Sequence, residues 1–252
     1  MKIVTLEERP DLLSAMNAPE LTPGPKSVAI EIAGEENLGR LEKVFPAYQV
    51  MLLDEGRIVA KGYSIPFSWD EGVELPDEGW DCVVVKGFAD HDAKLETTAL
   101  CALWIVVASD KRNTGLSSQV LEGLRSVASD HGLPVMYAPV RPSRKSEFPL
   151  IPLEDYVEWT LSDGQTPFDP WLRVHLRAGG RIMNVCTHSM ETVGTIADWE
   201  SATGLPFPGS GDYIVPGALA PVHVDVEHDF VTYVEPNVWV RHETTRPSAS
   251  SF

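Results

Sequence analysis

The sequence predicts an α/β (α+β) fold in which a central, mixed but mostly antiparallel sheet is flanked by helices. Apolar runs with the spacing of strands alternate along the chain with runs that have the 3.6-residue spacing of helices. The clearest unit is a strand, a turn, an amphipathic helix and a second strand within residues 103 to 140. The 252 residues are 43% hydrophobic and 23% charged, which is enough for the core of an ordinary globular protein.

The first part of the chain is expected to supply a strand, helices and a hairpin. Proline residues near position 20 predict a turn there, and a turn containing Gly56 separates two apolar runs, which is typical of a hairpin. The expected elements are, in order, a strand (2–6), a helix (7–17), a helical stretch (35–44), two hairpin strands (48–53 and 58–64), a strand (80–86) and a central strand (99–108).

Residues 103 to 118, LWIVVASDKRNTGLSS, carry the most specific signal. A strand of β-branched residues runs into a turn that opens a helix, whose apolar residues recur at 116, 120, 121, 124, 127 and 128. Small residues in the first helical turn leave backbone N–H groups accessible, and the helix dipole favours an anion such as phosphate. Arg112 precedes Gly115 by three residues and can bind the same anion. The alternative is that Gly115 and the serines only cap the helix.

Other nucleotide-binding motifs do not match this turn. A Rossmann turn requires Gly-x-Gly-x-x-Gly followed by an acidic residue, and a P-loop requires Gly-x-x-x-x-Gly-Lys-Ser/Thr. Neither pattern occurs in the chain.

The strand, phosphate turn, helix and following strand (133–140) resemble the cofactor-binding core of the GNAT acyltransferases. The family pattern is Gln/Arg-x-x-Gly-x-Gly/Ala, and this chain has Arg112-Asn-Thr-Gly115-Leu-Ser117, with serine in the last position. The resemblance places a cofactor core at about residues 99 to 145 and implies that coenzyme A binds there. Its pyrophosphate would contact the turn residues Arg112, Asn113, Thr114, Gly115, Leu116, Ser117 and Ser118.

The same resemblance assigns roles to the backbone of the central strand. Counting back from Arg112, the amide that binds the thioester carbonyl would lie near Ile105. Val106 and Val107 would form hydrogen bonds with the pantetheine arm. Because backbone groups perform these tasks, the side chains can be plain hydrophobic residues that also belong to a core strand.

The charge distribution favours a small anionic ligand over a nucleic acid. The net charge of −17 repels nucleic acid and acidic membranes. Basic residues nevertheless gather around the phosphate turn and the next strand, where they would bind the phosphates of coenzyme A. Of these residues, Arg144 is also expected to bind the cofactor. The alternative for Arg125 and Arg141 is a solvated helix face and a basic loop. The basic residues that gather there are Lys111, Arg112, Arg125, Arg141, Arg144 and Lys145.

The rest of the chain predicts an extended C-terminal portion of the same domain. Asp169 as N-cap, Pro170 at the first helical position and Gly179 at the end predict a helix between them. The expected elements are helices at 153–161, 169–179 and 196–203, and strands at 181–185, 212–215, 220–226 and 231–240. One domain is expected over residues 1 to 243, with a disordered tail over 244 to 252.

The resemblance also predicts the chemistry and the candidate catalytic residues. In GNAT enzymes an amine attacks the acyl-CoA thioester directly within a ternary complex. Many members carry a glutamate base eleven positions before the Gln/Arg, and this chain has Cys101 there. Tyr156 is the expected general acid. The remaining candidates for the base are Asp92, Glu96, His175 and Glu235.

We therefore expect a CoA-dependent N-acyltransferase that acts on the amine of a small molecule. A non-catalytic acyl-CoA-binding protein and a transferase that uses aminoacyl-tRNA are the alternatives. Aromatic residues could line an acyl or acceptor pocket or form core; they are Tyr63, Phe67, Trp69, Trp80 and Phe88.

The remaining expectations concern the setting of the protein. Segments at 138–143, 169–175 and 233–242 resemble a bacterial GNAT branch of uncertain substrate. Three widely spaced cysteines and unpaired histidines predict buried thiols and no metal site. No apolar run is long enough for a membrane span, and the chain start lacks the apolar centre of a signal peptide, so we expect a cytoplasmic protein. A homodimer is left open.

Overall fold

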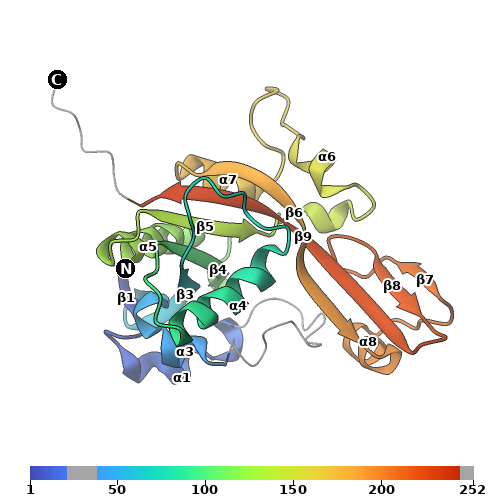
Figure 1. Cartoon of the computed structure of the whole chain (residues 1–252), viewed down its shortest axis with the longest axis horizontal. Coiled ribbons are helices and arrows are strands. Elements are labelled where there is room, and N and C mark those ends of the chain that lie inside the picture. The colour runs from blue at the N-terminus through green and yellow to red at the C-terminus, as the bar shows by residue number, and fades with distance from the viewer. Residues whose placement is uncertain (22–38, 245–252) are drawn as a thin grey trace.

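One curved sheet organises the molecule. The computed structural model describes residues 1–21 and 39–244 (Figure 1), and within them nine strands form a sheet of order β1-β2-β3-β4-β5-β9-β8-β7, with β6 paired to β9. Only β4 and β5 run parallel, so the sheet is mixed and mostly antiparallel, as predicted. The strands are β1 (Lys2–Thr5), β2 (Val50–Asp54), β3 (Arg57–Phe67), β4 (Ala99–Val107), β5 (Val135–Val140), β6 (Arg181–Gly194), β7 (Gly211–Tyr213), β8 (Val222–Asp225) and β9 (Phe230–Glu243).

Helices cover both faces of this sheet. Buried side chains of α1, α3 and α4 join one hydrophobic cluster, and those of α5, α6 and α7 join a second cluster on the opposite face. We call these the α4 face and the α5 face. The α-helices are α1 (Leu13–Met16), α3 (Leu41–Val44), α4 (Gly79–Asp92), α5 (Leu116–Asp130), α6 (Leu153–Val157), α7 (Pro170–Arg177) and α8 (Ile196–Thr203).

The helix α4 corrects the strand that the sequence predicted at residues 80 to 86. Its buried residues include Trp80, Val83, Val84, Gly87 and Phe88, a spacing of three and four that belongs to a helix. The run of three valines has high strand propensity, but packing of this stripe against β3 and β6 outweighs it.

Several other boundaries differ from expectation. The helix predicted over 7–17 is a 3-10 turn at Pro10–Leu12 followed by the single-turn helix α1, and the helix predicted over 153–161 ends at Val157. Of the helical stretch predicted at 35–44, α3 forms the end, and the part before residue 39 lies outside the described residues. Thr244, predicted to begin a tail, is buried and donates its hydroxyl to the Leu133 carbonyl at 2.5 Å. Residues 245–252 are not described.

The predicted helix after the phosphate turn is confirmed as α5, which packs closely against β3. A Cβ atom on Gly62 would lie 2.7 Å from Val120 Cγ1, so only glycine allows this approach. Leu116, Leu121 and Leu124 are buried beneath the helix. This contact fixes the start of α5 relative to the sheet.

The extended C-terminal portion is an arm built on two long strands. The strands β6 and β9 have 14 residues each and continue beyond β5, where β8 and β7 pair with the far part of β9 and α8 packs alongside (Figure 1). Trp199, Phe207, Val222, Val231 and Tyr233 belong to a separate hydrophobic cluster there. We call this part, residues 190–235, the C-terminal arm.

The two cysteines in the core agree with the expected buried thiols. Cys101 and Cys186 are fully buried and unbonded to other cysteines, and Cys82 is half-buried. Burial raises the pKa of the Cys186 thiol to about 12, so this thiol stays protonated.

Two buried histidines meet between α7 and β9. His175 Nδ1 lies 2.9 Å from His242 Nε2, and both rings are at most 2% exposed. Burial, reinforced by the neighbouring His242, lowers the pKa of His175 to about 3, and burial together with Arg125 lowers that of His242 to about 4. The pair is therefore neutral and held by one hydrogen bond at pH 7.

This pair predicts a loss of stability in mild acid. In the unfolded chain both histidines titrate near their ordinary value of about 6.5, so the unfolded state binds more protons below that pH. The contribution is complete above pH 6.5 and is lost as the pH falls toward 4, on the order of 3 kcal/mol for each histidine at about 1.4 kcal/mol per pH unit. Urea unfolding between pH 7 and pH 4 measures the slope. His242→Gln should flatten it, whereas His131→Gln, at an exposed site, should leave it unchanged; equal slopes in all three proteins would contradict the assignment.

Candidate functional site

The strands β4 and β5 separate soon after they meet. They pair at Ala99 with Val135, Leu100 with Met136, and Cys101 with Tyr137. β4 then continues to Val107 and β5 to Val140, with no further pairing between these two described strands. The two strands form a V that opens toward their C-terminal ends.

A β-bulge lies where β4 leaves β5. Tyr63 of β3 faces Trp104, but the next residue of β3, Ser64, faces Ala102, so Leu103 is an extra residue. A bulge bends its strand and increases the local twist. The bulge at Leu103 thus accompanies the opening of the V.

The hydrogen-bond alternation of β4 shows which backbone groups face the V. Ala108 donates its N–H to the Val59 carbonyl at 2.9 Å, and opposite residues of an antiparallel ladder alternate between bonded and non-bonded pairs. Counting back from Ala108, Val106 bonds to β3. The backbone groups of Ile105 and Val107 therefore point to the open side. Ile105, expected at the thioester carbonyl, and Val107, expected at the pantetheine arm, both face the V, whereas Val106, also expected at the pantetheine arm, does not.

The turn before α5 has the geometry of an open anion site. Asn113 and Gly115 have φ values of 61° and 80°, in the left-handed region. Gly115 is the N-cap of α5, with no side-chain hydrogen bond to the helix start, and Ser117 and Ser118 lie in its first turn. The Thr114 hydroxyl is turned away to the Lys111 carbonyl, at 2.5 Å. The first N–H groups of a 15-residue helix are left without a side-chain cap.

Most of the basic residues expected around this turn have partners inside the protein. Arg144 pairs with Glu147 at 2.6 Å and lies over the Phe168 ring, while Lys145 is buried and donates to the Leu219 carbonyl at 2.6 Å. Arg125 donates to the carbonyls of Glu243 and Ala178, and Lys111 lies 3.4 Å from Asp54. Among the described residues Arg112 forms no ion pair and is exposed, so it remains available to a ligand.

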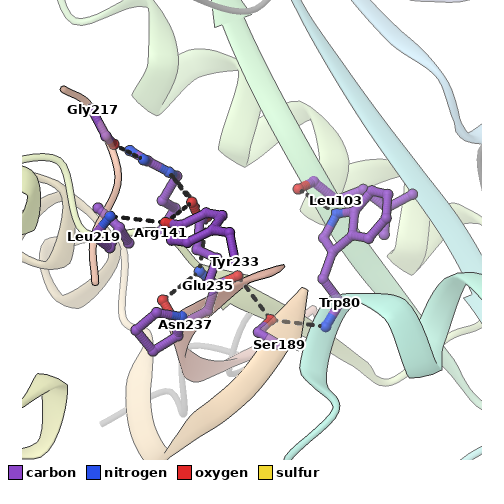
Figure 2. Close-up of polar contacts among 10 residues, drawn as sticks. Trp80, Leu103, Arg141, Ser189, Gly217, Leu219, Tyr233, Glu235 and Asn237 are labelled. Atoms are coloured by element: carbon purple, nitrogen blue, oxygen red, sulfur yellow. Dashed lines mark hydrogen bonds and ion pairs between the residues drawn. The ribbon is translucent and has the colours of Figure 1, made fainter. Parts of the chain in front are cut away.

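An aromatic group covers the α4 face of the bulge. Trp80, from the first turn of α4, donates its indole N–H to the Leu103 carbonyl at 3.3 Å. Trp104 stacks on Tyr63 with ring centroids 4.5 Å apart, and lies 6.0 Å from Trp80. Trp80 thereby fixes the orientation of the peptide group at the bulge (Figure 2).

A second polar cluster lies next to this stack. Lys61 is 4% exposed and donates to the Met16 carbonyl at 2.8 Å and to the Tyr63 hydroxyl at 3.2 Å. The Tyr63 hydroxyl donates in turn to Glu42 at 2.6 Å. Burial lowers the pKa of the Lys61 ammonium to about 8, and Glu42 opposes this effect. The cluster ties α1 and α3 to β3.

A buried hydrogen-bond network connects Trp80 to the arm (Figure 2). The Trp80 backbone N–H donates to Ser189 Oγ at 3.0 Å, and Ser189 donates to Asn237 Oδ1 at 2.9 Å. Asn237 Nδ2 lies 3.4 Å from Glu235 Oε1. The bulge in β4 and the base of the arm thus share one series of contacts, which we call the Ser189 network.

The network ends at a carboxylate held by an arginine (Figure 2). Glu235 is 7% exposed, and Arg141 Nε lies 3.0 Å from each of its oxygens. The Tyr233 hydroxyl donates to Glu235 at 2.9 Å, and burial together with this carboxylate raises the pKa of the Tyr233 hydroxyl. Arg141 Nη2 also donates to the Gly217 carbonyl at 2.5 Å. Burial disfavours the Arg141 cation, but Glu235 raises its pKa overall.

A cavity of about 140 Å³ opens beside this ion pair. Since Met190 contributes to its wall and also packs against the cluster of the α4 face, the cavity adjoins the face on which Trp80 lies. We call it the arm cavity. It is lined by Arg141, Met190, Thr192, Trp199, Val215, Pro216, Gly217, Ala218, Tyr233 and Glu235.

The other catalytic candidates lie apart from this cavity. The Tyr156 hydroxyl is buried on the α5 face and donates to Asp169 at 2.9 Å, and burial raises its pKa. Asp169 is itself the N-cap of α7, as predicted, so Tyr156 takes part in a capping network. His175 belongs to the buried histidine pair. Asp92 has a 60% exposed side chain paired with Arg40, at the end of α4 opposite Trp80, roughly 20 Å away along the helix. Glu96 is exposed in the loop after α4.

Sequence reasoning missed several members of the network. Trp80 was expected in a strand or a pocket, and Ser189 and Asn237 were not singled out. Arg141 was grouped with the basic residues near the phosphate turn, with a basic loop as the alternative. The one sequence signal that could have placed Trp80 correctly was the helical spacing of the residues around it. No local pattern brings together positions 80, 189 and 237.

The described residues contain no group of three His, Cys, Asp or Glu that could hold a metal ion. Among the same residues, no helix has the length and hydropathy needed to cross a membrane.

Comparisons with known proteins found one curated relative and solved structures with a similar fold. The chain is 32% identical over 268 residues to the arginine N-acetyltransferase avaD of Aspergillus versicolor, covering 94% of this chain and 92% of that protein. The loading GNATL domain of CurA from Lyngbya majuscula superposes with a TM-score of 0.57 at 16% identity, over 96% and 97% of the two chains. The GphF GNAT-like decarboxylase, solved with isobutyryl-CoA, gives 0.55 at 20% identity, over 97% and 100%. No protein-family model matches the chain.

The Ser189 network should contribute measurably to stability. Ser189→Ala removes the partner of the buried Trp80 N–H and of Asn237, which should cost about 1–3 kcal/mol of unfolding free energy. Urea unfolding monitored by fluorescence gives this value. Ser126→Ala, at an exposed position of α5, is the matched control and should change stability by less than about 0.5 kcal/mol. A loss equal to that of the control would mean that the network is not formed.

Proposed function

The chain belongs to the GNAT superfamily of acyltransferases, and we propose that it transfers an acyl group from acyl-CoA to the amine of a small molecule by direct attack in a ternary complex. The V between β4 and β5 is the observation that carries this proposal. The backbone groups of Ile105 and Val107 line its open side without a strand partner among the residues that the structure describes, and the uncapped start of α5 follows a few residues later.

The donor would bind along β4. The pantetheine arm takes the place that a neighbouring strand would occupy, with hydrogen bonds to the backbone of Val107 and Ile105. The pyrophosphate then reaches the turn from Arg112 to Ser118, where the helix dipole, the uncapped N–H groups and the unpaired guanidinium of Arg112 favour it. Arg144 has Glu147 as its partner, so we assign it no contact with coenzyme A.

The thioester carbonyl would accept a hydrogen bond from the Ile105 amide. The amine attacks this carbonyl carbon, the oxygen gains negative charge, and the amide stabilises it. The carbon–sulfur bond then breaks, and the thiolate of coenzyme A leaves with the electron pair. The amine nitrogen loses one proton, and the leaving sulfur gains one. Because Trp80 holds the neighbouring Leu103 carbonyl, the amide is fixed before the donor binds.

Glu235 is the carboxylate that we assign to the amine. Among the candidate bases it alone lines the arm cavity, on the face that Trp80 shares with the bulge. It can attract an ammonium group and accept its proton directly or through water. Asp92, His175 and Glu96 lack such a position. Cys101 is fully buried, and burial raises its pKa, which disfavours a thiolate there. Tyr156 donates its hydroxyl to Asp169, so we do not assign it as the general acid.

The acceptor that we propose is a small cationic amine of the arginine type. The relative at 32% identity is named an arginine N-acetyltransferase. A net charge of −17 attracts cations toward the protein and raises their association rate. The same charge disfavours the aminoacyl-tRNA alternative; loss of activity on adding RNase would revive it. We further propose a cytoplasmic enzyme of a bacterial branch, and a homodimer remains an outcome that sedimentation would decide.

Donor binding tests the first half of this proposal. Arg112→Ala should weaken binding of CoA by roughly tenfold to a hundredfold, because a charge-assisted hydrogen bond to phosphate is lost. Gly115→Glu should weaken it further, since it adds a negative charge and a side chain where φ is 80°. Calorimetric titration with CoA measures both. Arg177→Ala, an exposed arginine of α7, is the control. Unchanged affinity in both turn variants would mean that the turn only caps α5.

Turnover tests the second half. Glu235→Gln should lower kcat by about 10²- to 10⁴-fold, while the affinity for CoA changes little. Release of free thiol from acetyl-CoA in the presence of an amine is the measurement. Asp92→Asn, at the far end of α4, serves as the carboxylate control and should retain the wild-type rate. If Asp92→Asn lost activity and Glu235→Gln kept it, the base would be misassigned. Binding of acyl-CoA with no release across a broad amine panel would favour a non-catalytic binding protein.

A further inference from the structure

The arm cavity contains a buried donor that has no partner. Trp199 is 0% exposed and forms part of the cavity wall, yet its indole Nε1 has no hydrogen-bond partner among the described residues. Buried N–H groups in folded proteins are almost always bonded to protein, water or ligand. The indoles of Trp80 and Trp239 donate to the carbonyls of Leu103 and Pro76, whereas Trp104 Nε1, in the aromatic stack on β4, also lacks a partner among the described residues. Of the two, only Trp199 lines the arm cavity, so a molecule in this cavity is the partner that we consider for its N–H.

A second donor stands in the same wall. Arg141 uses Nε for Glu235 and Nη2 for Gly217, and its side chain also interacts with the Tyr233 hydroxyl. A guanidinium carries five N–H groups, so it can donate to a ligand oxygen besides these partners. Its side chain is 45% exposed, so a ligand can reach it. The planar guanidinium suits carbonyl and carboxylate oxygens in particular.

The cavity wall therefore contains both a hydrogen-bond acceptor and hydrogen-bond donors. Glu235 accepts hydrogen bonds and attracts a cation, whereas Trp199 and Arg141 donate. Met190, Val215 and Ala218 supply apolar wall between them. A molecule with an amine and an oxygen on adjacent carbons can satisfy both, since its nitrogen meets the carboxylate while its oxygen meets the donors. An amine without such an oxygen leaves the Trp199 N–H unpaired.

We infer that the arm cavity is the acceptor site and that Trp199 and Arg141 recognise a carbonyl oxygen next to the reacting amine. The acceptor class is thus an α-amino acid or its amide, and simple alkyl amines are rejected. This inference rests on the proposed function and specifies its substrate. Trp199 is a specificity-determining residue, and its partner is either a carboxylate or an amide carbonyl.

Three related amines separate these possibilities. L-Arginine carries a carboxylate next to its amine, L-argininamide an amide carbonyl, and agmatine neither. In the wild-type protein, kcat/KM is measured by thiol release from acetyl-CoA. The value for agmatine should be roughly tenfold to a hundredfold lower than the higher of the values for L-arginine and L-argininamide. This is the usual effect of an unpaired buried donor. A preference for L-arginine over L-argininamide identifies the carboxylate, and equal rates identify the carbonyl oxygen. Equal kcat/KM for all three compounds would overturn the inference.

The variant Trp199→Phe tests the residue itself. It keeps an aromatic ring and removes the N–H, so the discrimination against agmatine should fall to within about threefold, with the loss confined to the two carbonyl compounds. Trp159→Phe, in the aromatic cluster of the α5 face, is the matched control and should keep the wild-type ratio. Equal ratios in wild type and Trp199→Phe would remove Trp199 from the site. If Trp199→Phe does not fold, the comparison of the three amines in the wild-type chain still decides.

Failure of the proposed function would be visible separately. If no amine releases thiol while CoA binds, the transfer activity is not established. The three compounds are then titrated by calorimetry into the CoA-saturated wild-type chain. Binding of a carbonyl compound at least tenfold tighter than that of agmatine still supports the cavity as a site. No difference among them overturns it.

Discussion

The separation of β4 from β5 after three residue pairs is the constraint on which the rest of the structure depends. Two adjacent strands in the middle of a sheet would ordinarily satisfy each other's backbone groups. Here the bulge at Leu103 accompanies the opening, and the backbone of Ile105 and Val107 is left for another partner. An extended molecule with amides and carbonyls of its own, such as the pantetheine arm, can supply what the missing strand does not.

Both faces of the sheet support this opening. On the α5 face, Gly62 lets α5 approach so closely that its uncapped start comes to a fixed place beyond β4. On the α4 face, Trp80 holds the Leu103 carbonyl and connects it through Ser189 and Asn237 to Glu235. One framework therefore connects the proposed donor and acceptor sides, and a fixed framework is what a direct transfer between two bound reactants would need.

Local signals in the sequence predicted the elements that local interactions decide. The strand before residue 108, the turn at Gly115 and the helix α5 follow from apolar spacing and small residues. The cap at Asp169 and the proline after it marked the start of α7 in the same way. The valines at 83 to 85 predicted a strand wrongly, because strand propensity is weak compared with burial. The helical spacing at 80, 83, 84, 87 and 88 was the better signal.

By itself the sequence determined the fold class and the family resemblance, because the signals behind them each lie within about twenty positions of chain; the anion site at the turn before α5 stays a prediction. Only the tertiary structure decided how the distant polar residues are used. Arg141 pairs with Glu235 across 94 residues of chain, Arg144 pairs locally, and Tyr156 serves a helix cap. A basic or acidic side chain takes its role from the partner that folding brings within about 3 Å, and no local pattern specifies that partner.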